Sequence, residues 1–380
     1  MTRLASSHTR LAFLSCAHFL AAALLATASH AQSPTAQTGT TNPTSPAASS
    51  AAHVTQPIFQ FHSGFWLNLH HFLYLQARLR EGELISRNDS SKPAGSTGAA
   101  APPAKDSAAN PPDAPAGQAA VDYYAKNLAH RDLLFDNGMV LIENRLADLE
   151  ACPDLSGYQA PACSSGLRPE MITALEGAAP IYRARWWATD DQRNREWMAQ
   201  VTPYIHSMGS LVAEQLEAIY HANWPKDPTR VDVVTYAGPF GAYTTLDPTY
   251  VTVSSTDPRN QGLSAFEILF HEASHQLATS VQDAIVKVCH QEDIPIPRDL
   301  WHALLFYTTG EVVRRTLARS EAPSTPSAAH PASYTPYAAR NGLYTRGWED
   351  YQRALIAYWQ PYLDGRDTFD HAIASVVAAL

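Results

Sequence analysis

Apolar residues recur at helical spacing along several long stretches of the chain. Residues 59–84 and 121–149 each carry one apolar stripe with polar residues between its members. The same period returns over residues 299–320, 347–363 and 369–380. Because this spacing places the apolar side chains on one face of a helix, the pattern predicts a chain built mainly of helices.

The period changes in the middle of the chain. Residues 230–237 alternate apolar and polar side chains, and residues 241–246 and 250–255 are rich in β-branched and aromatic residues. Proline and glycine separate these stretches, as expected for turns between strands. We therefore expect an α+β fold, mainly helical, with a small sheet ahead of the next helix.

That next helix carries the most specific motif, His271-Glu272-Ala273-Ser274-His275. Residues four apart share one face of a helix, so both imidazoles can bind one metal ion while Glu272 stands beside them. Apolar residues surround the motif, which predicts that the helix is buried. The alternative is a helix with two hydrogen-bonded core histidines. The pattern favours a zinc-hydrolase site over that alternative.

A catalytic zinc ion takes three protein ligands and leaves one position open. Glu311 is the candidate we favour for the third ligand, because a lone carboxylate in an apolar helix needs a partner. Its neighbour Gly310 is costly inside a helix and predicts that another helix approaches closely there. A surface Glu paired with Arg314 or Arg315 is the alternative.

His302 is the rival ligand, and acids such as Asp283 also remain open. His302 and Glu311 are nine residues apart, so an unbroken helix places them on opposite faces and one metal ion cannot take both. A second histidine group, His62, His70 and His71, has no paired carboxylate at ligand spacing, which favours a structural role.

With His271, Glu272 and His275 followed by a distant Glu311, residues 249–315 resemble the gluzincin metallopeptidases of the thermolysin and neprilysin type, in a secreted, bacterial-type branch. The resemblance implies a zincin-like catalytic domain in which an edge strand ahead of the zinc helix holds the substrate. An ordinary edge strand is the alternative. The chain departs from these families in lacking their Asn-Glu pair. Arg315 also stands where an acid often orients a zinc histidine.

The proposed chemistry follows from the zinc ligands. Glu272 is expected to act as general base on a zinc-activated water. A further donor must stabilise the oxyanion, and Tyr344, His302, Tyr337 and Arg340 are the candidates. The sequence thus predicts a zinc-dependent peptidase that acts on a peptide or protein. The alternatives are a zinc hydrolase of a non-peptide, cell-wall amide and a non-catalytic metal-binding envelope protein.

The N-terminus predicts export. Residues 1–31 read as a signal peptide, with Arg3 and Arg10 ahead of an apolar stretch too short to span a bilayer. Its removal takes the formal charge from −9 to −11, and no basic cluster follows. This composition argues against nucleic acid as a partner. We expect a secreted or periplasmic protein with no integral membrane segment after cleavage; the sequence leaves its oligomeric state open.

The remaining chain divides by composition. Residues 32–56 read as a disordered tether, and residues 57–380 as one catalytic domain with a disordered insertion at residues 86–120. In an oxidising compartment, Cys152 and Cys163 are the expected disulfide, because they close a loop with little apolar content. Cys289 is left over and is expected to be a buried thiol.

Overall fold

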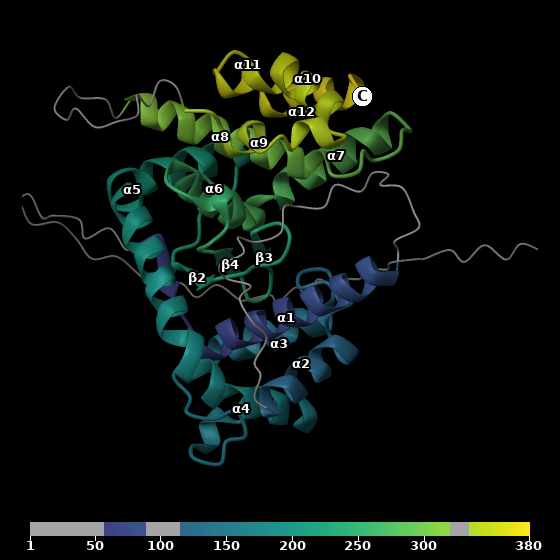
Figure 1. The fold of residues 1–380 in the computed structure, drawn as a ribbon. Coiled ribbons are helices and arrows are strands. Elements are labelled where there is room, and N and C mark those ends of the chain that lie inside the picture. Colours follow the sequence, from purple (N-terminus) through teal and green to yellow (C-terminus); the bar gives the residue numbers. More distant parts are fainter. Residues whose placement is uncertain (1–56, 89–114, 320–333) are drawn as a thin grey trace, which may run out of the picture. The chain divides into compact units, whose positions relative to one another are not determined.

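The computed structural model describes residues 57–88, 115–319 and 334–380, and the account below concerns these residues. Helices dominate, and four strands form one small mixed sheet, as the α+β prediction requires. Figure 1 shows the sheet in the middle of these residues, with helices on both sides of it. The expected signal peptide and tether lie outside the described residues.

The sheet has the strand order β1-β2-β4-β3. Strands β1 (Phe59–His62), β2 (Thr229–Val234) and β4 (Tyr250–Ser254) run parallel to one another, and β3 (Ala242–Thr245) pairs antiparallel with β4. The three strands predicted in the middle of the chain are therefore confirmed. The strand directly ahead of the zinc-motif helix is β4, which lies inside the sheet because β2 and β3 pair with it on its two sides, so the expectation of an edge strand at this position is wrong. Strands β1 and β3 form the edges.

Two of the predicted helices are divided. Residues 59–62 form β1 instead of helix, because they pair with β2, and α1 (Phe65–Asn88) starts only after them. The stretch 121–149 breaks between α2 (Pro115–Asn127) and α3 (Asn137–Asp148). The break has a local cause: Asp136 caps α3 by accepting hydrogen bonds from the backbone N–H groups of Gly138 and Met139.

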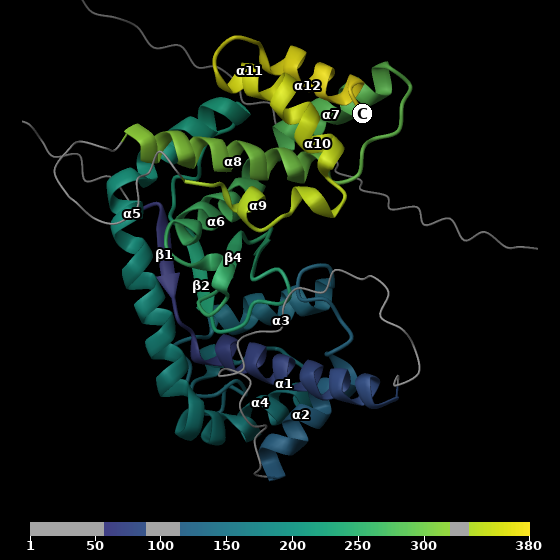
Figure 2. The same cartoon turned by 45° about the horizontal axis from the view of Figure 1, so that its top comes forward.

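The insertion expected at residues 86–120 is helical at both ends, since α1 runs to Asn88 and α2 begins at Pro115. Residues 89–114, its centre, lie outside the described residues. With α4 (Pro169–Tyr182), these helices form an N-terminal core that packs on one side of the sheet and includes Val234 and Tyr243. Figure 2 shows α1, α3 and α4 grouped together, apart from the C-terminal helices.

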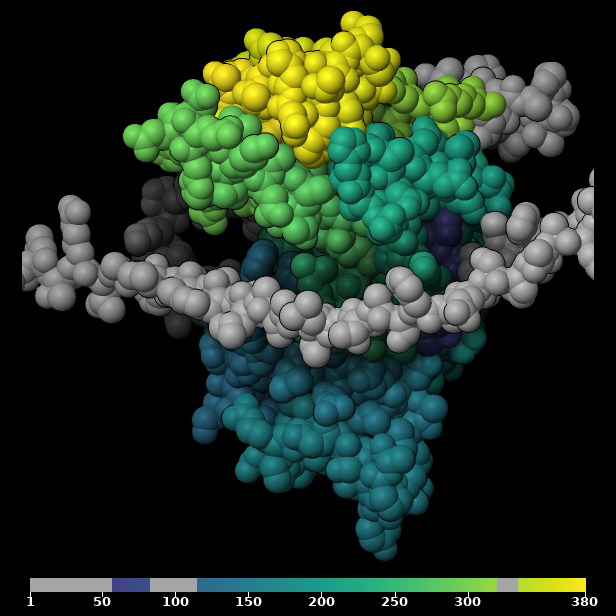
Figure 3. Space-filling model, turned by 180° about the vertical axis from the view of Figure 1, so that it is seen from behind, coloured from purple at the N-terminus to yellow at the C-terminus, as the bar shows by residue number. Residues whose placement is uncertain are grey.

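The other side of the sheet carries the C-terminal core. It contains the long helix α5 (Ala188–Tyr220), together with α6 (Leu263–Ser274), α7 (Thr279–Gln291) and α8 (Leu300–Arg319). The last helices are α9 (Tyr337–Arg340), α10 (Glu349–Ala354), α11 (Gln360–Leu363) and α12 (Phe369–Ala378). In the space-filling view, the yellow C-terminal residues lie directly against the light green residues around α7 (Figure 3).

Both cysteine predictions are confirmed. Cys152 and Cys163 form a disulfide with a Cα–Cα distance of 5.6 Å, and Cys289 is a buried free thiol in the C-terminal core. Within the described parts of the chain, no helix combines the length and the apolar character needed to cross a membrane.

Candidate metal centre

Helix α6 holds the His-Glu-Ala-Ser-His motif in the C-terminal core. Every residue from Ser264 to Ser274 is buried, so this helix meets protein on all sides. The α-helix ends at Ser274 and continues as one tighter turn over His275–Leu277. The His271 and His275 rings remain neighbours, with their centroids 5.1 Å apart. The helical prediction for the motif is therefore confirmed.

His302 joins this pair from the first turn of α8. One nitrogen from each of His271, His275 and His302 lies within 4.8 Å of the other two. The Nε2 atoms of His271 and His302 are 3.2 Å apart. Tetrahedral zinc with Zn–N bonds of about 2.1 Å would hold two ligand nitrogens roughly 3.4 Å apart, so the spacing of this pair fits one zinc ion.

The charge state of the three rings also suits a metal. Burial lowers the pKa of His275 to about 3 and that of His302 to about 4, and it lowers the pKa of His271 well below its usual range. All three are therefore neutral at pH 7, the form that binds a metal ion. One feature departs from typical zinc sites: the Nδ1 of His271 is buried without a hydrogen-bond partner among the described residues.

Aromatic side chains surround the three histidines. The Phe306 ring stacks on His271 with a centroid distance of 3.4 Å, and it also lies near His302 at 5.0 Å and Tyr337 at 6.1 Å. Trp301 contacts His275 at 5.5 Å, and Trp348 contacts His302 at 5.7 Å. Both tryptophans are partly exposed. The histidines thus lie among apolar rings, where little else can hydrogen-bond to their nitrogens.

Glu272 lies beside the histidines. Its Oε2 atom is 3.9 Å from the Nε2 of His275 and accepts a 2.8 Å hydrogen bond from the hydroxyl of Thr244 on β3. The residue is 5% exposed, and burial raises the pKa of its carboxyl to about 7, while the Thr244 hydroxyl lowers it. A carboxyl with a pKa near neutrality can both accept and release a proton at physiological pH.

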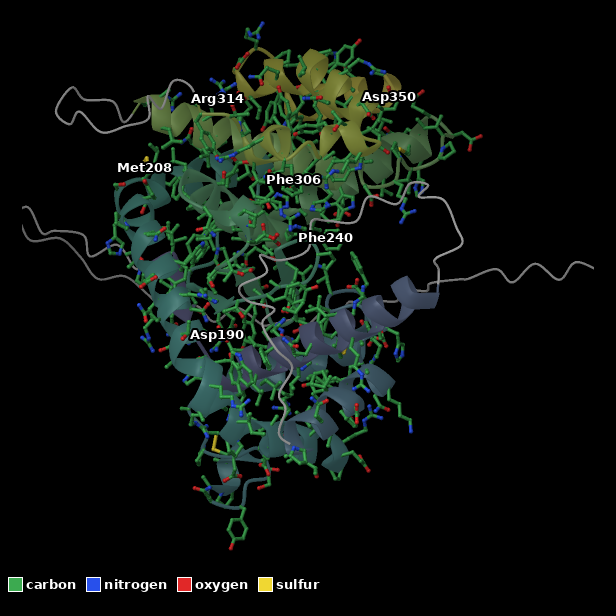
Figure 4. The ribbon with its side chains drawn as sticks, viewed as in Figure 1. Asp190, Met208, Phe240, Phe306, Arg314 and Asp350 are labelled. Atoms are coloured by element: carbon green, nitrogen blue, oxygen red, sulfur yellow. A yellow bond between two sulfur atoms is a disulfide. The ribbon has the colours of Figure 1, made fainter. Side chains whose placement is uncertain are left out.

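The structure does not bring Glu311 to this group. Its carboxylate accepts hydrogen bonds from Arg314, at 2.9 and 2.6 Å, and lies 3.6 Å from Arg315. It lines a surface hollow between α5, α8 and α11, together with Gln215, Ile219 and Leu363. Arg314 is labelled in Figure 4, well away from Phe306 on the same helix. His302 lies beside His271 and His275 and Glu311 does not, because the two residues are on opposite faces of α8.

The predicted oxyanion donors are also separated. Tyr344 is buried in the C-terminal core, and no hydrogen bond or ring contact among the described residues joins it to the three histidines. Tyr337 comes closer to the site, because its ring stacks on Phe306 and its hydroxyl lies 3.2 Å from Asn260 Oδ1.

Arg340, the remaining candidate donor, binds the hydroxyl of Ser264 at the start of α6. His302 lies in the site, but as a candidate ligand instead of an oxyanion donor.

Gly310 explains how the segment before α9 reaches this region. A Cβ atom at Gly310 would lie 2.7 Å from the Cβ of Pro336 and 3.1 Å from Glu267 Oε1. The predicted close approach is confirmed. Glu267, one turn before His271 on α6, accepts hydrogen bonds from the backbone N–H of Tyr337 and the hydroxyl of Tyr334. This anchors Tyr337 beside Phe306.

The sequence did not reveal the contact of Thr244 with Glu272, since a threonine in a β-rich stretch carries no functional signal by itself.

No protein-family model, curated protein or solved structure matches the chain. The case for the site therefore depends on its own geometry.

Proposed function

We propose that the protein is a zinc-dependent hydrolase acting on peptide bonds, with zinc held by His271, His275 and His302. One observation carries the proposal: three imidazole nitrogens from two helices converge within 4.8 Å, next to the buried carboxyl of Glu272. A binding module has no need of a general base at this position. In the described residues, no other group of histidine, cysteine and acidic side chains converges in this way.

Bound zinc would polarise a carbonyl and lower the pKa of a water molecule to about 7. The protein's own groups supply the rest. Glu272 would accept a proton from the attacking water and deliver it to the leaving amine. The aromatic residues Trp301, Phe306 and Trp348 would limit access of bulk water, which strengthens electrostatic interactions at the site.

We also propose that the protein works outside the cytoplasm. The Cys152–Cys163 disulfide supports this placement, because such bonds persist in oxidising compartments. The signal-peptide reading of residues 1–31 supports it independently.

Metal analysis and a protease assay test the proposal. The purified protein without residues 1–31 should contain one zinc ion per chain and should digest labelled casein, and 1,10-phenanthroline should stop the digestion. Glu272→Gln should retain zinc and reduce hydrolysis by about 10²-fold or more, because the proton acceptor is lost while the ligands remain.

Three results would count against this function: zinc-free protein, equal activity of the Glu272→Gln variant, or parallel loss of zinc and activity in that variant. Digestion of peptidoglycan without digestion of casein would instead identify a cell-wall amide as the substrate.

A further inference from the structure

Strand β3 contacts the proposed general base directly. The Thr244 hydroxyl lies 2.8 Å from Glu272 Oε2 and 2.9 Å from the backbone carbonyl oxygen of the same residue. A threonine hydroxyl has one proton, so it donates to one of these oxygens at a time. It therefore lies between the carboxylate and the backbone carbonyl of Glu272, and when it donates to the carboxylate it restricts the direction in which that side chain points.

The carbonyl of Glu272 lies near the end of α6, where the usual partner four residues later is lost. In the tighter turn at His275, the backbone N–H of His275 donates to this carbonyl instead. A carbonyl oxygen has two lone pairs, so the Thr244 hydroxyl can be its second donor.

Thr244 is itself held firmly. It is 6% exposed, and its backbone lies in the antiparallel pair of β3 and β4, opposite the fully buried Val251. As a β-branched residue it has few side-chain rotamers. Among the hydrogen bonds of the described residues, it provides the only side-chain donor to the Glu272 carboxylate.

We propose that Thr244 is a positioning residue for Glu272, which it aims at the attacking water from the edge strand of the sheet. This inference rests on the proposed hydrolase function. A misaligned base loses efficiency steeply, since an error of about 1 Å can cost roughly 10²-fold in rate.

The test compares substitutions at two adjacent threonines of β3. Thr244→Val removes the hydroxyl and keeps the shape of the side chain. Thr245→Val is the matched control: Thr245 is equally buried, and its hydroxyl contacts Asn144 and the carbonyl of Pro248. Thr244→Ser restores the hydroxyl. The measurements are zinc content, kcat and KM on labelled casein, and crystal structures of the zinc-loaded variants.

We expect Thr244→Val to keep its zinc and to lose about 10²-fold in kcat with little change in KM. Thr244→Ser should recover most of kcat, and Thr245→Val should resemble the wild type. In the crystal structure of Thr244→Val, the Glu272 carboxylate should have turned away from its wild-type position. In Thr245→Val it should keep that position.

Equal kcat for Thr244→Val and Thr245→Val, with the Glu272 carboxylate unmoved, would overturn the role of Thr244. A wild type that fails to bind zinc, or a Glu272→Gln variant with full activity, would overturn the hydrolase function instead. If Thr244→Val does not fold, Thr244→Ala replaces it, and the same comparison with Thr244→Ser and Thr245→Val decides the question.

Discussion

Two groups of buried or half-buried histidines lie next to the same strand, β3. Towards the C-terminal core, Thr244 binds Glu272 beside His271, His275 and His302, which we name the triad group. Towards the N-terminal core, the Tyr243 hydroxyl lies 3.2 Å from the Nε2 of His71. Adjacent residues of a strand point to opposite faces of the sheet, so one strand serves both groups.

The second group consists of His70, His71 and Glu143, and we name it the α1 group. Its side chains are at least as buried as those of the triad group. His70 pairs with the hydroxyl of Tyr124, and its Nε2 lies 3.9 Å from Glu143. A carboxylate does reach these histidines, although the sequence places none at ligand spacing.

The difference between the groups is one of direction. His70 and His71 are adjacent on α1, so their side chains leave the helix about 100° apart and reach different partners. His271 and His275 are four residues apart and point the same way, and α8 adds a third ring. Burial of several histidines is thus common to both groups, and convergence on one point is found only in the triad group.

The largest expected effect concerns zinc affinity. His302→Ala should weaken zinc binding by at least about 100-fold, because loss of a ligand exceeds the 10- to 100-fold cost of losing a supporting contact. Glu311→Gln, on the same helix, should bind zinc as the wild type does. Titration with a competing chelator measures both. Zinc loss in Glu311→Gln with zinc retention in His302→Ala would instead support the ligand set predicted from the sequence.

A second prediction concerns the pKa of the Glu267 carboxyl, which anchors Tyr334 and Tyr337 next to the triad group. Burial raises its pKa from 4.5 to about 7, against the hydrogen bonds from Tyr334 and Tyr337. Between these values the folded protein keeps a proton that the unfolded chain loses, so stability falls as pH rises. The change is about 3 kcal/mol at 1.36 kcal/mol per pKa unit.

Glu267→Gln should abolish that pH-dependent loss, since an amide does not titrate. Urea unfolding at pH 4.5 and pH 8 measures the free energy of unfolding, with Glu311→Gln as the control. The same pH dependence in Glu267→Gln and in the wild type would contradict the assignment.

His71 of the α1 group should respond to pH in the direction opposite to Glu267. Burial lowers the pKa of His71 from 6.5 to about 3. Below pH 6.5 the unfolded chain binds a proton that the folded protein does not, so stability falls as pH decreases, by about 2 kcal/mol at pH 5.

His71→Gln should remove that part of the pH dependence and leave zinc content unchanged. Unfolding curves at pH 7 and pH 5 measure it, with chelator present in both so that zinc release does not contribute. A change in zinc content would show that the two groups are coupled through β3.

The sequence carried the local part of this site. The four-residue spacing of His271 and His275 and their apolar neighbours predict a buried helix because helix geometry is local. The cost of Gly310 predicted a close approach, and Pro336 makes it. Cysteine spacing predicted the disulfide.

The long-range part of the site could not be read from the sequence. The choice between His302 and Glu311 depends on which face α8 turns towards α6, and both residues fit a helix equally well. In the structure, Arg314 and Arg315 form ion pairs with Glu311 and neutralise its charge locally. Thr244 binds Glu272 only after the sheet pairs β3 with β4, and strand pairing is a property of the whole fold.

Cys289 gives the protein a built-in reporter of local opening. Its thiol is fully buried in α7, packed with the same core that holds α6 and α8. An alkylating reagent can therefore reach it only when this part of the molecule opens transiently. In the chain without residues 1–31, the alkylation rate of the Cys289 thiol can be measured with and without zinc. The difference between the two rates would report how strongly the triad group binds metal.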